Sequence, residues 1–479
     1  MQRRAKRNAP MPRPFNRLLV AWFASVTGDG MRFAALPLLA LTLSPSPVAV
    51  AAVAAATTLP WLLIALPAGA IVDRLDPAAV IAGANASRAL ATALLVVAVL
   101  SDRAAIGLLC AVGFVLTAGE TFADSAGQSL LVRVVPRDRL ETANARFVSS
   151  ENIGLDLIGP LAAGALFVTA HWLPFAIAAG IFLATAYGVL TLRGYSSAEV
   201  GRSSSVPVTA AAGPSSDGAG STVPTFAGAA PAFDGGGSAP AGSPSGVSPA
   251  GAKAVGATSG HSFPGAPDLI GAAAGQRLSV LAGFRVIFSD TQLRSLVITV
   301  AIMSAAIAAA EGVLVIYSAS SLRLPATLYP TLLACYSVGL VLAAAAVSRW
   351  GARIRSGPMM VAAVAVIGAT LLLMGAFPHP VVAWCSFLVM GAAGGVWNVL
   401  SASRRQRRTP PSMIARVSST FRAIAWGALP LGTALGGLIG QTRNVPTVFI
   451  TAGLLVLALA VVAGRFLIPA ADDQAEAAS

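Results

Sequence analysis

The chain has 479 residues, of which 56% are apolar and only 11% are charged, and its mean hydropathy is +0.76. A globule of this size needs a charged surface to stay in water, whereas a surface that faces lipid needs none, so this composition excludes an ordinary soluble protein. The net charge of +13 does not indicate nucleic-acid binding, because the basic residues lie in short segments between apolar runs and form no basic domain.

Cysteine and histidine, with three residues each, are scattered along the chain. An odd number of cysteines inside apolar runs cannot form a disulfide framework, and the histidines lack the spacing of metal ligands. We therefore expect no metal site and no cofactor.

The apolar runs predict an all-α integral membrane protein. A bilayer core takes about 20 apolar residues per helix, with a tolerated range of about 17–25. The first run follows a basic segment, as in a signal peptide, but it continues to about Leu43 and is too long for the apolar region of a cleaved signal. Twelve transmembrane helices are predicted, near 18–43, 47–71, 78–100, 104–130, 143–169, 172–193, 292–319, 325–347, 357–376, 381–403, 415–440 and 446–468.

The arginines predict how these helices are oriented, because cytoplasmic segments of membrane proteins collect Lys and Arg. With the N-terminus in the cytoplasm, the outside loops hold only Arg103, Arg323 and Arg443. The inside segments then hold Arg74; Arg133, Arg137 and Arg139; Arg193 and Arg277; Arg349, Arg353 and Arg355; and Arg404, Arg405, Arg407 and Arg408. This alternation predicts an even number of helices in a bacterial cell membrane, with both termini cytoplasmic.

Residues 194–279 differ in composition, being rich in Gly, Ala, Ser and Pro with almost no charge. Such a segment cannot bury enough apolar surface to offset its ordering entropy, so we predict a disordered cytoplasmic linker. Apolar residues at helical spacing from Leu278 to Leu293 predict a short amphipathic helix on the membrane surface. The predicted organisation is a basic cytoplasmic N-terminus at 1–17, a six-helix bundle at 18–193, the linker at 194–279, a second six-helix bundle with its leading interfacial helix at 280–468, and a cytoplasmic tail at 469–479.

Two similar offsets indicate that the halves are related. Arg74 and Arg349 follow the second and eighth predicted helices and are 275 residues apart. Phe147 and Phe421 lie at the start of the fifth and eleventh predicted helices and are 274 residues apart. A duplication of six helices joined by a linker would produce both offsets.

The Gly-x-x-x-Asp-Arg pattern at Gly69, Asp73 and Arg74 resembles the signature loop of the major facilitator superfamily. The sequence departs from that pattern at Asp76-Pro77-Ala78, where the family usually continues with Gly and basic residues, and the second copy keeps Arg349 but lacks the Asp. Other segments resemble the branch with enterobactin exporters and macrolide or multidrug efflux proteins, namely Gly28-Asp29-Gly30, Leu59-Pro60-Trp61, Leu66-Pro67-Ala68-Gly69, Gly119-Glu120-Thr121 with Asp124, and Ala425 to Gly432. The resemblance implies twelve helices in two pseudo-symmetric six-helix bundles and a transporter that is not an enzyme.

Charged side chains inside the predicted helices are the candidate functional residues. Each costs about 2.5–3.5 kcal/mol to insert into a bilayer, so it normally faces a cavity or a partner. They are Asp29, Arg32, Arg88, Glu120, Asp124, Glu151, Asp156, Glu311 and Arg422. We assign Asp29, Glu120, Asp156 and Glu311 to a cavity that carries protons or substrate.

Asp29 also has a structural interpretation, because Arg32 lies three residues further on and nearly on the same helix face. The two interpretations are compatible. Glu311 has no such alternative: it is the only acidic residue inside a helix of the second half, and its own predicted helix offers no basic partner near it.

Glu120 and Asp124 are four residues apart and share one helix face. Two carboxylates at similar depth repel each other, which favours binding of a proton. For Asp124, the alternative is an ion pair with Arg74 or Arg146 near the inner end of the bundle.

The family resemblance implies that Asp73 and Arg74 form an inner gate, with the aspartate near the start of the eleventh helix, where the helix dipole favours an anion. An ordinary positive-inside loop would explain Arg74 but not Asp73. The residues assigned to this gate are Gly69, Asp73, Arg74, Arg349, Glu151 and Arg422.

These features predict a secondary transporter that works by alternating access. No Gly-x4-Gly-Lys-Ser/Thr motif occurs in the chain, which favours an ion gradient over ATP as the energy source. We expect proton-coupled efflux of a small amphipathic molecule by a monomer whose partners are the lipid bilayer, the substrate and protons. The alternatives are an importer or uniporter of the same fold, a non-transporting receptor, and a polytopic membrane enzyme, although the scattered histidines supply no catalytic constellation.

Overall fold

The computed structural model describes residues 11–64, 68, 71–72, 74–136, 139–193, 284–350, 356–409 and 413–468. The chain divides into one compact unit made of Met1–Ser204 with Ile270–Ser479 and another made of Ser205–Leu269, and every described residue belongs to the first. The predicted linker and both predicted terminal segments lie largely outside the described residues. Of the predicted interfacial helix from Leu278 to Leu293, residues 284–289 are helical, the helix is interrupted at Asp290, and residues 291–293 belong to the following helix.

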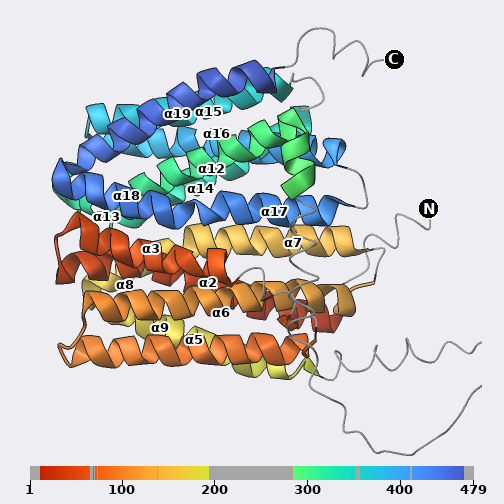
Figure 1. Cartoon of the computed structure of the whole chain (residues 1–479). Helices are drawn as coiled ribbons and strands as arrows, with labels where there is room; N and C mark the ends of the chain where they lie inside the picture. The colour runs from red at the N-terminus through yellow and green to blue at the C-terminus, as the bar shows by residue number, and fades with distance from the viewer. Residues whose placement is uncertain are drawn as a thin grey trace, which may run out of the picture. The chain divides into compact units, whose positions relative to one another are not determined.

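The first six predicted spans correspond to helices of the structure, drawn from red to yellow in Figure 1. The fifth span is three consecutive helical segments, because a seven-residue π-helix interrupts it. The bounds are α2 (Arg13–Leu43), α3 (Pro47–Leu63), α5 (Pro77–Leu100), α6 (Ile106–Val134), α7 (Leu140–Glu151), η2 (Asn152–Ile158), α8 (Gly159–Thr169) and α9 (Leu173–Leu190).

The last six spans form the second bundle, drawn from green to blue in Figure 1. The seventh span again contains a π-helix, and the eleventh is divided at Ala428. The bounds are α12 (Thr291–Gly312), α13 (Leu314–Ile316), η3 (Tyr317–Ser321), α14 (Tyr329–Trp350), α15 (Ser356–Ala376), α16 (Pro380–Arg408), α17 (Ile414–Gly427), α18 (Leu429–Thr442) and α19 (Val445–Leu467).

Ten helical stretches within the described ranges are long and apolar enough to cross a bilayer. The other two of the twelve are α2, in which Asp29 and Arg32 lower the hydropathy, and α3, whose assigned helix has 17 residues. The twelve-helix membrane fold predicted from the sequence is confirmed.

Local chemistry explains where several helices begin. Asp76 caps α5 by accepting a hydrogen bond from the Ala78 amide at 3.2 Å, and Pro77 occupies the first helical turn, where its missing N–H costs nothing. Asp76-Pro77-Ala78, the place where the sequence departs from the family loop, is therefore a helix start. Ser46 and Asn444 cap α3 and α19 in the same way.

The first residue of α8, directly after the π-helix η2, packs against α2 at very short range. A Cβ atom added at Gly159 would lie 2.6 Å from both the Thr27 carbonyl oxygen and the Gly30 Cα atom. Only a residue without a side chain allows the two backbones to approach this closely. Because η2 carries Asp156 and α2 carries Asp29, this contact positions two of the candidate carboxylates.

We expect Gly159→Ala to lower the melting temperature of the detergent-purified protein, because the added methyl group meets backbone atoms that cannot move aside, and such overpacking costs about 1–3 kcal/mol. Gly180→Ala in α9 is the matched control, since its Cβ would have no neighbour within 4 Å. Equal melting temperatures for the two variants would contradict the assignment.

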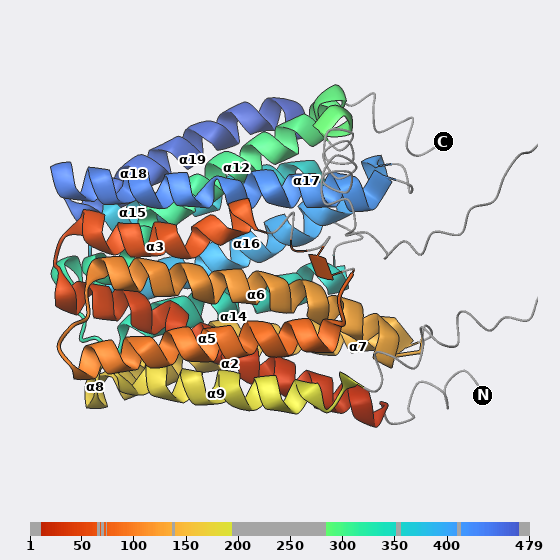
Figure 2. The ribbon, with the colours of Figure 1, turned by 60° about the horizontal axis from the view of Figure 1, so that its bottom comes forward.

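The two halves meet along two seams, and Figure 2 shows the first of them, where α3 runs beside α18 and α17. Ser46 donates a hydrogen bond to Gln441 at 2.9 Å at one end of this seam, and the rings of Trp61 and Trp426 are 4.6 Å apart further along it. In the second seam, α14 packs against α8 and η2. We call the end of the bundle that holds Ser46 and Gln441 the closed end, and the end where α12 begins and α16 ends the basic end.

At the basic end, Asp290 links the start of α12 to the end of α16. Its carboxylate accepts hydrogen bonds from the Gln292 and Leu293 amides at 2.7 and 3.0 Å and from Arg408 at 3.2 Å. Partial burial disfavours the ionised carboxyl, but the Leu293 amide, Arg408 and the Gln292 amide outweigh it and hold the pKa of Asp290 below its ordinary value.

Since the folded pKa of Asp290 lies below the unfolded value of about 3.9, its contribution to stability is complete above that value and is lost as the pH falls through the folded pKa. Asp290→Asn keeps a capping side chain but loses the charge. We expect the variant to melt slightly below the parent at pH 7 and the gap to close below about pH 4. Thermal unfolding measured from pH 7 to pH 3.5 tests this, and a gap that widens in acid would contradict it.

Candidate functional site

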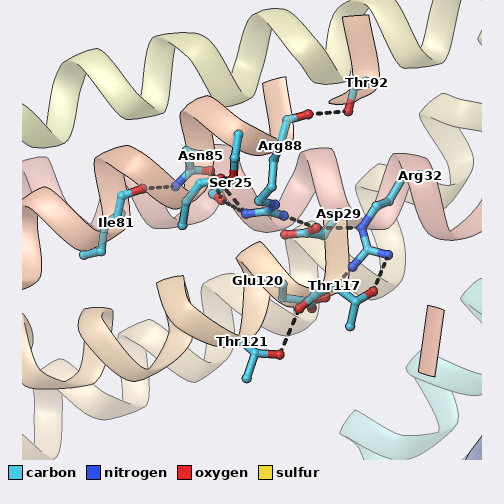
Figure 3. Close-up of polar contacts among 12 residues, drawn as sticks. Ser25, Asp29, Arg32, Ile81, Asn85, Arg88, Thr92, Thr117, Glu120 and Thr121 are labelled. Atoms are coloured by element: carbon cyan, nitrogen blue, oxygen red, sulfur yellow. Dashed lines mark hydrogen bonds and ion pairs between the residues drawn. The ribbon is translucent and has the colours of Figure 1, made fainter. Parts of the chain in front are cut away.

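Asp29 is the centre of a buried ionic network within the first bundle, shown in Figure 3. One of its oxygens, Oδ1, accepts a hydrogen bond from Arg32 Nε at 2.9 Å and another from Arg88 Nη2. The side chains of Asp29 and Arg32 are 3% exposed and that of Arg88 is 1% exposed, so one carboxylate is shared by two guanidinium groups away from water. The predicted Asp29–Arg32 pair is present in the structure.

Arg32 connects this centre to α6. Its Nη2 forms an ion pair with Glu120 Oε2, and its Nη1 donates to Thr117 Oγ1 at 3.2 Å. All three guanidinium nitrogens of Arg32 are therefore engaged, two of them by carboxylates. Glu120 is the more accessible acid of the network, with 15% of its side chain exposed.

The Arg88 side chain contacts residues of α2, α5 and α9. Its Nη1 donates to Ser25 Oγ at 3.1 Å and to Asn85 Oδ1 at 3.2 Å, and its guanidinium lies 4.0 Å from the centre of the Phe182 ring. Gly119 makes room for it, since a Cβ there would lie 2.6 Å from Arg88 Cγ. Its buried Nε has no hydrogen-bond partner among the residues that the structure describes.

The role of Arg88 was not predicted from the sequence, which placed it only near the inner part of the third helix. A signal was available: Asn85 and Arg88 are three residues apart in an otherwise apolar helix, so they share a face that must point toward polar groups.

Asp124 and Glu151 lie near this network but form no hydrogen bond with it. Both interact electrostatically with Glu120 and with Asp29. The region therefore holds four carboxyl groups and two guanidinium groups, and full ionisation would leave it negative. Within the described ranges Asp124 makes no ion pair, so the predicted alternative of a bridge to Arg74 or Arg146 is not formed.

Asp156 and Glu311 lie at a second place, between the two bundles. Asp156 belongs to η2 of the first half and Glu311 to α12 of the second, yet the two carboxyl groups are close enough to interact electrostatically. Tyr336 of α14 interacts with both of them. The structure thus divides the four predicted cavity carboxylates into two pairs, Asp29 with Glu120 and Asp156 with Glu311.

The predicted gate residues are only partly covered. Gly69, Asp73 and the side chain of Arg349 lie outside the described residues. Arg74 and Arg422 are exposed, and Arg422 interacts with Arg405. Among the described side chains, neither Arg74 nor Arg422 forms an ion pair, so Glu151 and Arg422 are not joined.

Comparison with known proteins decides the family. The model of the Major Facilitator Superfamily matches residues 18–430. The chain belongs to the major facilitator superfamily. It is therefore a multi-pass membrane transporter and not an enzyme.

Solved structures of this superfamily share the fold across nearly the whole chain. The nucleoside transporter NupG is similar with a TM-score of 0.66 and 12% identity, covering 96% of this chain and 100% of NupG. A bacterial homologue of the iron transporter ferroportin in an inward-facing state is similar with a TM-score of 0.62 and 16% identity, covering 96% and 99%. A bacterial homologue of the human lysosomal transporter Spinster, inward-facing and unoccupied, has a TM-score of 0.61 and 10% identity, covering 95% and 97%. No curated protein matches the chain.

Charge balance in the network can be tested by removing its charges singly and together. We expect Arg32→Gln to lower the melting temperature strongly, because it leaves Glu120 buried without its cation, and breaking a buried ion pair costs about 3–5 kcal/mol. The double variant Arg32→Gln with Glu120→Gln should recover most of the loss, since Asp29 and Arg88 still form a neutral pair. Fluorescence-detected size exclusion after heating gives the comparison. Additive losses in the double variant would show that the two side chains do not interact.

Proposed function

We propose that this transporter is a proton-coupled exporter of small amphipathic molecules. In this proposal it works as a monomer in the bacterial cell membrane, with both termini cytoplasmic, as the placement of the arginines favours. The observation that carries the proposal is that Arg32 is shared between Asp29 and the more accessible Glu120. A shared guanidinium makes the ion pair of α2 with α6 depend on whether Glu120 holds a proton.

Proton binding would act on the helices as follows. A proton on Glu120 removes one of the two charges that hold Arg32, and Arg32 stays with Asp29 on its own helix. The link from α2 to α6 is then weaker, while Arg88 keeps α5 joined to α2 through Asp29. Asp124 and Glu151 also interact electrostatically with Glu120, so the region holds more carboxyl groups than guanidinium groups.

Alternating access requires the closed end to open while the basic end closes. The contacts that must break are the two seams at which α3 meets α18 and α14 meets α8. We propose that Asp73 and Arg74, with Gly69, Arg349, Glu151 and Arg422, form the gate that closes the basic end. The exposure of Arg74 and Arg422 fits a state in which this end is open.

Gradient-driven flux in proteoliposomes tests the proposal with two probes that share a dansyl body. One is the trimethylammonium derivative of dansylcadaverine, a permanent cation that does not follow a pH gradient passively, and the other is the uncharged N-acetyl derivative. We expect an acidic lumen to drive uptake of at least one probe, and Glu120→Gln to abolish the dependence on the gradient. Asp102→Asn, an exposed loop change, is the control that should keep it.

Each rival predicts a different result. An importer that moves with protons would need the opposite gradient, and a uniporter would equilibrate the probes whatever the gradient. A receptor would move neither probe. Any of these three outcomes contradicts proton-coupled export.

A further inference from the structure

Asp156 and Glu311 form the second pair of carboxyl groups within the membrane-spanning helices, and no basic side chain of the described residues pairs with either of them. Asp29 and Glu120, by contrast, are both held by arginine. Within the same ranges, Asp156 is the charged group that acts on Glu311. Two carboxyl groups thus approach each other from opposite halves of the protein without a basic partner among the described residues.

Glu311 is an exposed residue between buried neighbours on both sides along the chain. Residues 308–310 and 312–318 are all buried, although Glu311 between them is exposed. A helix face in contact with lipid would be exposed again three or four residues away on either side, and this one is not. Glu311 therefore opens into a space among the helices rather than onto the lipid.

Tyr329 supplies an independent indication of a missing ligand. The residue is only 4% exposed, yet its hydroxyl has no hydrogen-bond partner among the described residues and is not one of their fully buried polar atoms, so this hydroxyl reaches an accessible space inside the protein. Tyr329 interacts electrostatically with Glu311. Tyr336, one to two turns further along α14, interacts with both carboxyl groups.

Tyr329 lies next to a contact that joins the two halves of the protein. Pro330, the residue after Tyr329, packs against Gly164 of α8, where a Cβ would lie 2.7 Å from Pro330 Cγ. The backbone at Thr327 is in the same contact, 3.2 Å from that position. A ligand held by Tyr329 and Glu311 would therefore touch the segment that must move when the closed end opens.

We propose that Asp156, Glu311 and Tyr329, with Tyr336, bind the ammonium group of an organic cation, so that the substrates of this transporter are amphipathic amines. The proposal rests on the transport function proposed above and specifies its substrate class. An ammonium supplies a positive charge where the described residues supply none, its N–H groups can donate to carboxyl oxygens and to the Tyr329 hydroxyl, and phenol rings attract cations through their faces.

A metal ion fits these residues less well. Divalent cations take six or more oxygen ligands or a set of nitrogen and sulfur ligands. No group of three or more His, Cys, Asp or Glu residues with suitable geometry occurs in the described ranges. Two carboxylates and two phenols suit a singly charged group with an aromatic or aliphatic body.

Equilibrium binding to the detergent-purified full chain tests the site without a gradient. Dansyl fluorescence follows the binding of dansylcadaverine, whose primary amine is protonated at pH 7, and of its uncharged N-acetyl derivative. We expect the amine to bind at least tenfold more tightly than the N-acetyl compound. Asp156→Asn and Glu311→Gln should each remove most of this preference while leaving the weak binding of the N-acetyl compound and the melting temperature unchanged.

Two further variants sharpen the test. Tyr329→Phe should weaken binding of dansylcadaverine several-fold but leave binding of the trimethylammonium derivative unchanged, because that cation has no N–H to donate. Asp102→Asn, the same chemical change in an exposed loop, should bind like the parent.

The proposal is overturned if the charged and uncharged compounds bind equally, if dansylcadaverine does not bind at millimolar concentration, or if both carboxylate variants keep the preference. Gradient-driven uptake of the N-acetyl probe together with any of these results would leave the transport proposal standing and reject only the ammonium site. Absence of gradient-driven uptake of both probes would reject the transport proposal, whatever the binding results.

Discussion

The cost of an uncompensated charge inside a bilayer is the constraint on which this structure depends. The first bundle meets it by placing two guanidinium groups on one carboxylate, so that Asp29 joins Arg32 of its own helix to Arg88 of α5. Arg32 then extends the network to Glu120 of α6. Three helices that are otherwise apolar are therefore joined at one depth by charges that none of them could bury alone. The small residues around the network serve this arrangement, since Gly119 leaves the volume that the Arg88 side chain fills.

Asp156 and Glu311, the second pair of carboxyl groups, receive no compensating positive charge from the described residues. They approach from different halves, and the hydroxyl of Tyr329 has no hydrogen-bond partner among the described residues. Asp29 and Glu120 are paired with arginines, whereas Asp156 and Glu311 have no basic partner in the described chain, so the two pairs are suited to different roles. The first network is suited to respond to protons, and the second is suited to receive a charged ligand. Both lie next to contacts between helices, because Gly159, directly after η2, packs α8 against α2, and Pro330 of α14 packs against Gly164 of α8.

The departure from the family loop also has a local physical cause. Asp76 and Pro77 cap and begin α5, so the residues that are usually basic in this superfamily here start a helix. Positive charge at the same end is supplied elsewhere, for example by Arg193, whose guanidinium lies 3.8 Å from Asp76. In the second bundle, the ion pair of Asp290 with Arg408 joins the start of α12 to the end of α16.

The sequence by itself determined the number, order and approximate bounds of the helices, and it singled out the carboxyl groups of both pairs, Asp29 with Glu120 and Asp156 with Glu311. Hydropathy and helix caps are local properties, and a charged residue inside an apolar run can be recognised from its neighbours in the sequence. The sequence also contained the Asp29–Arg32 pair, because three residues along a helix are neighbours in space. Only the tertiary structure decided that Arg88 binds Asp29, that Glu120 shares Arg32, and that Asp156 faces Glu311. Those partners come from different helices, and their meeting depends on the depth and rotation of each helix, which are set by packing between helices over distances that no local pattern encodes.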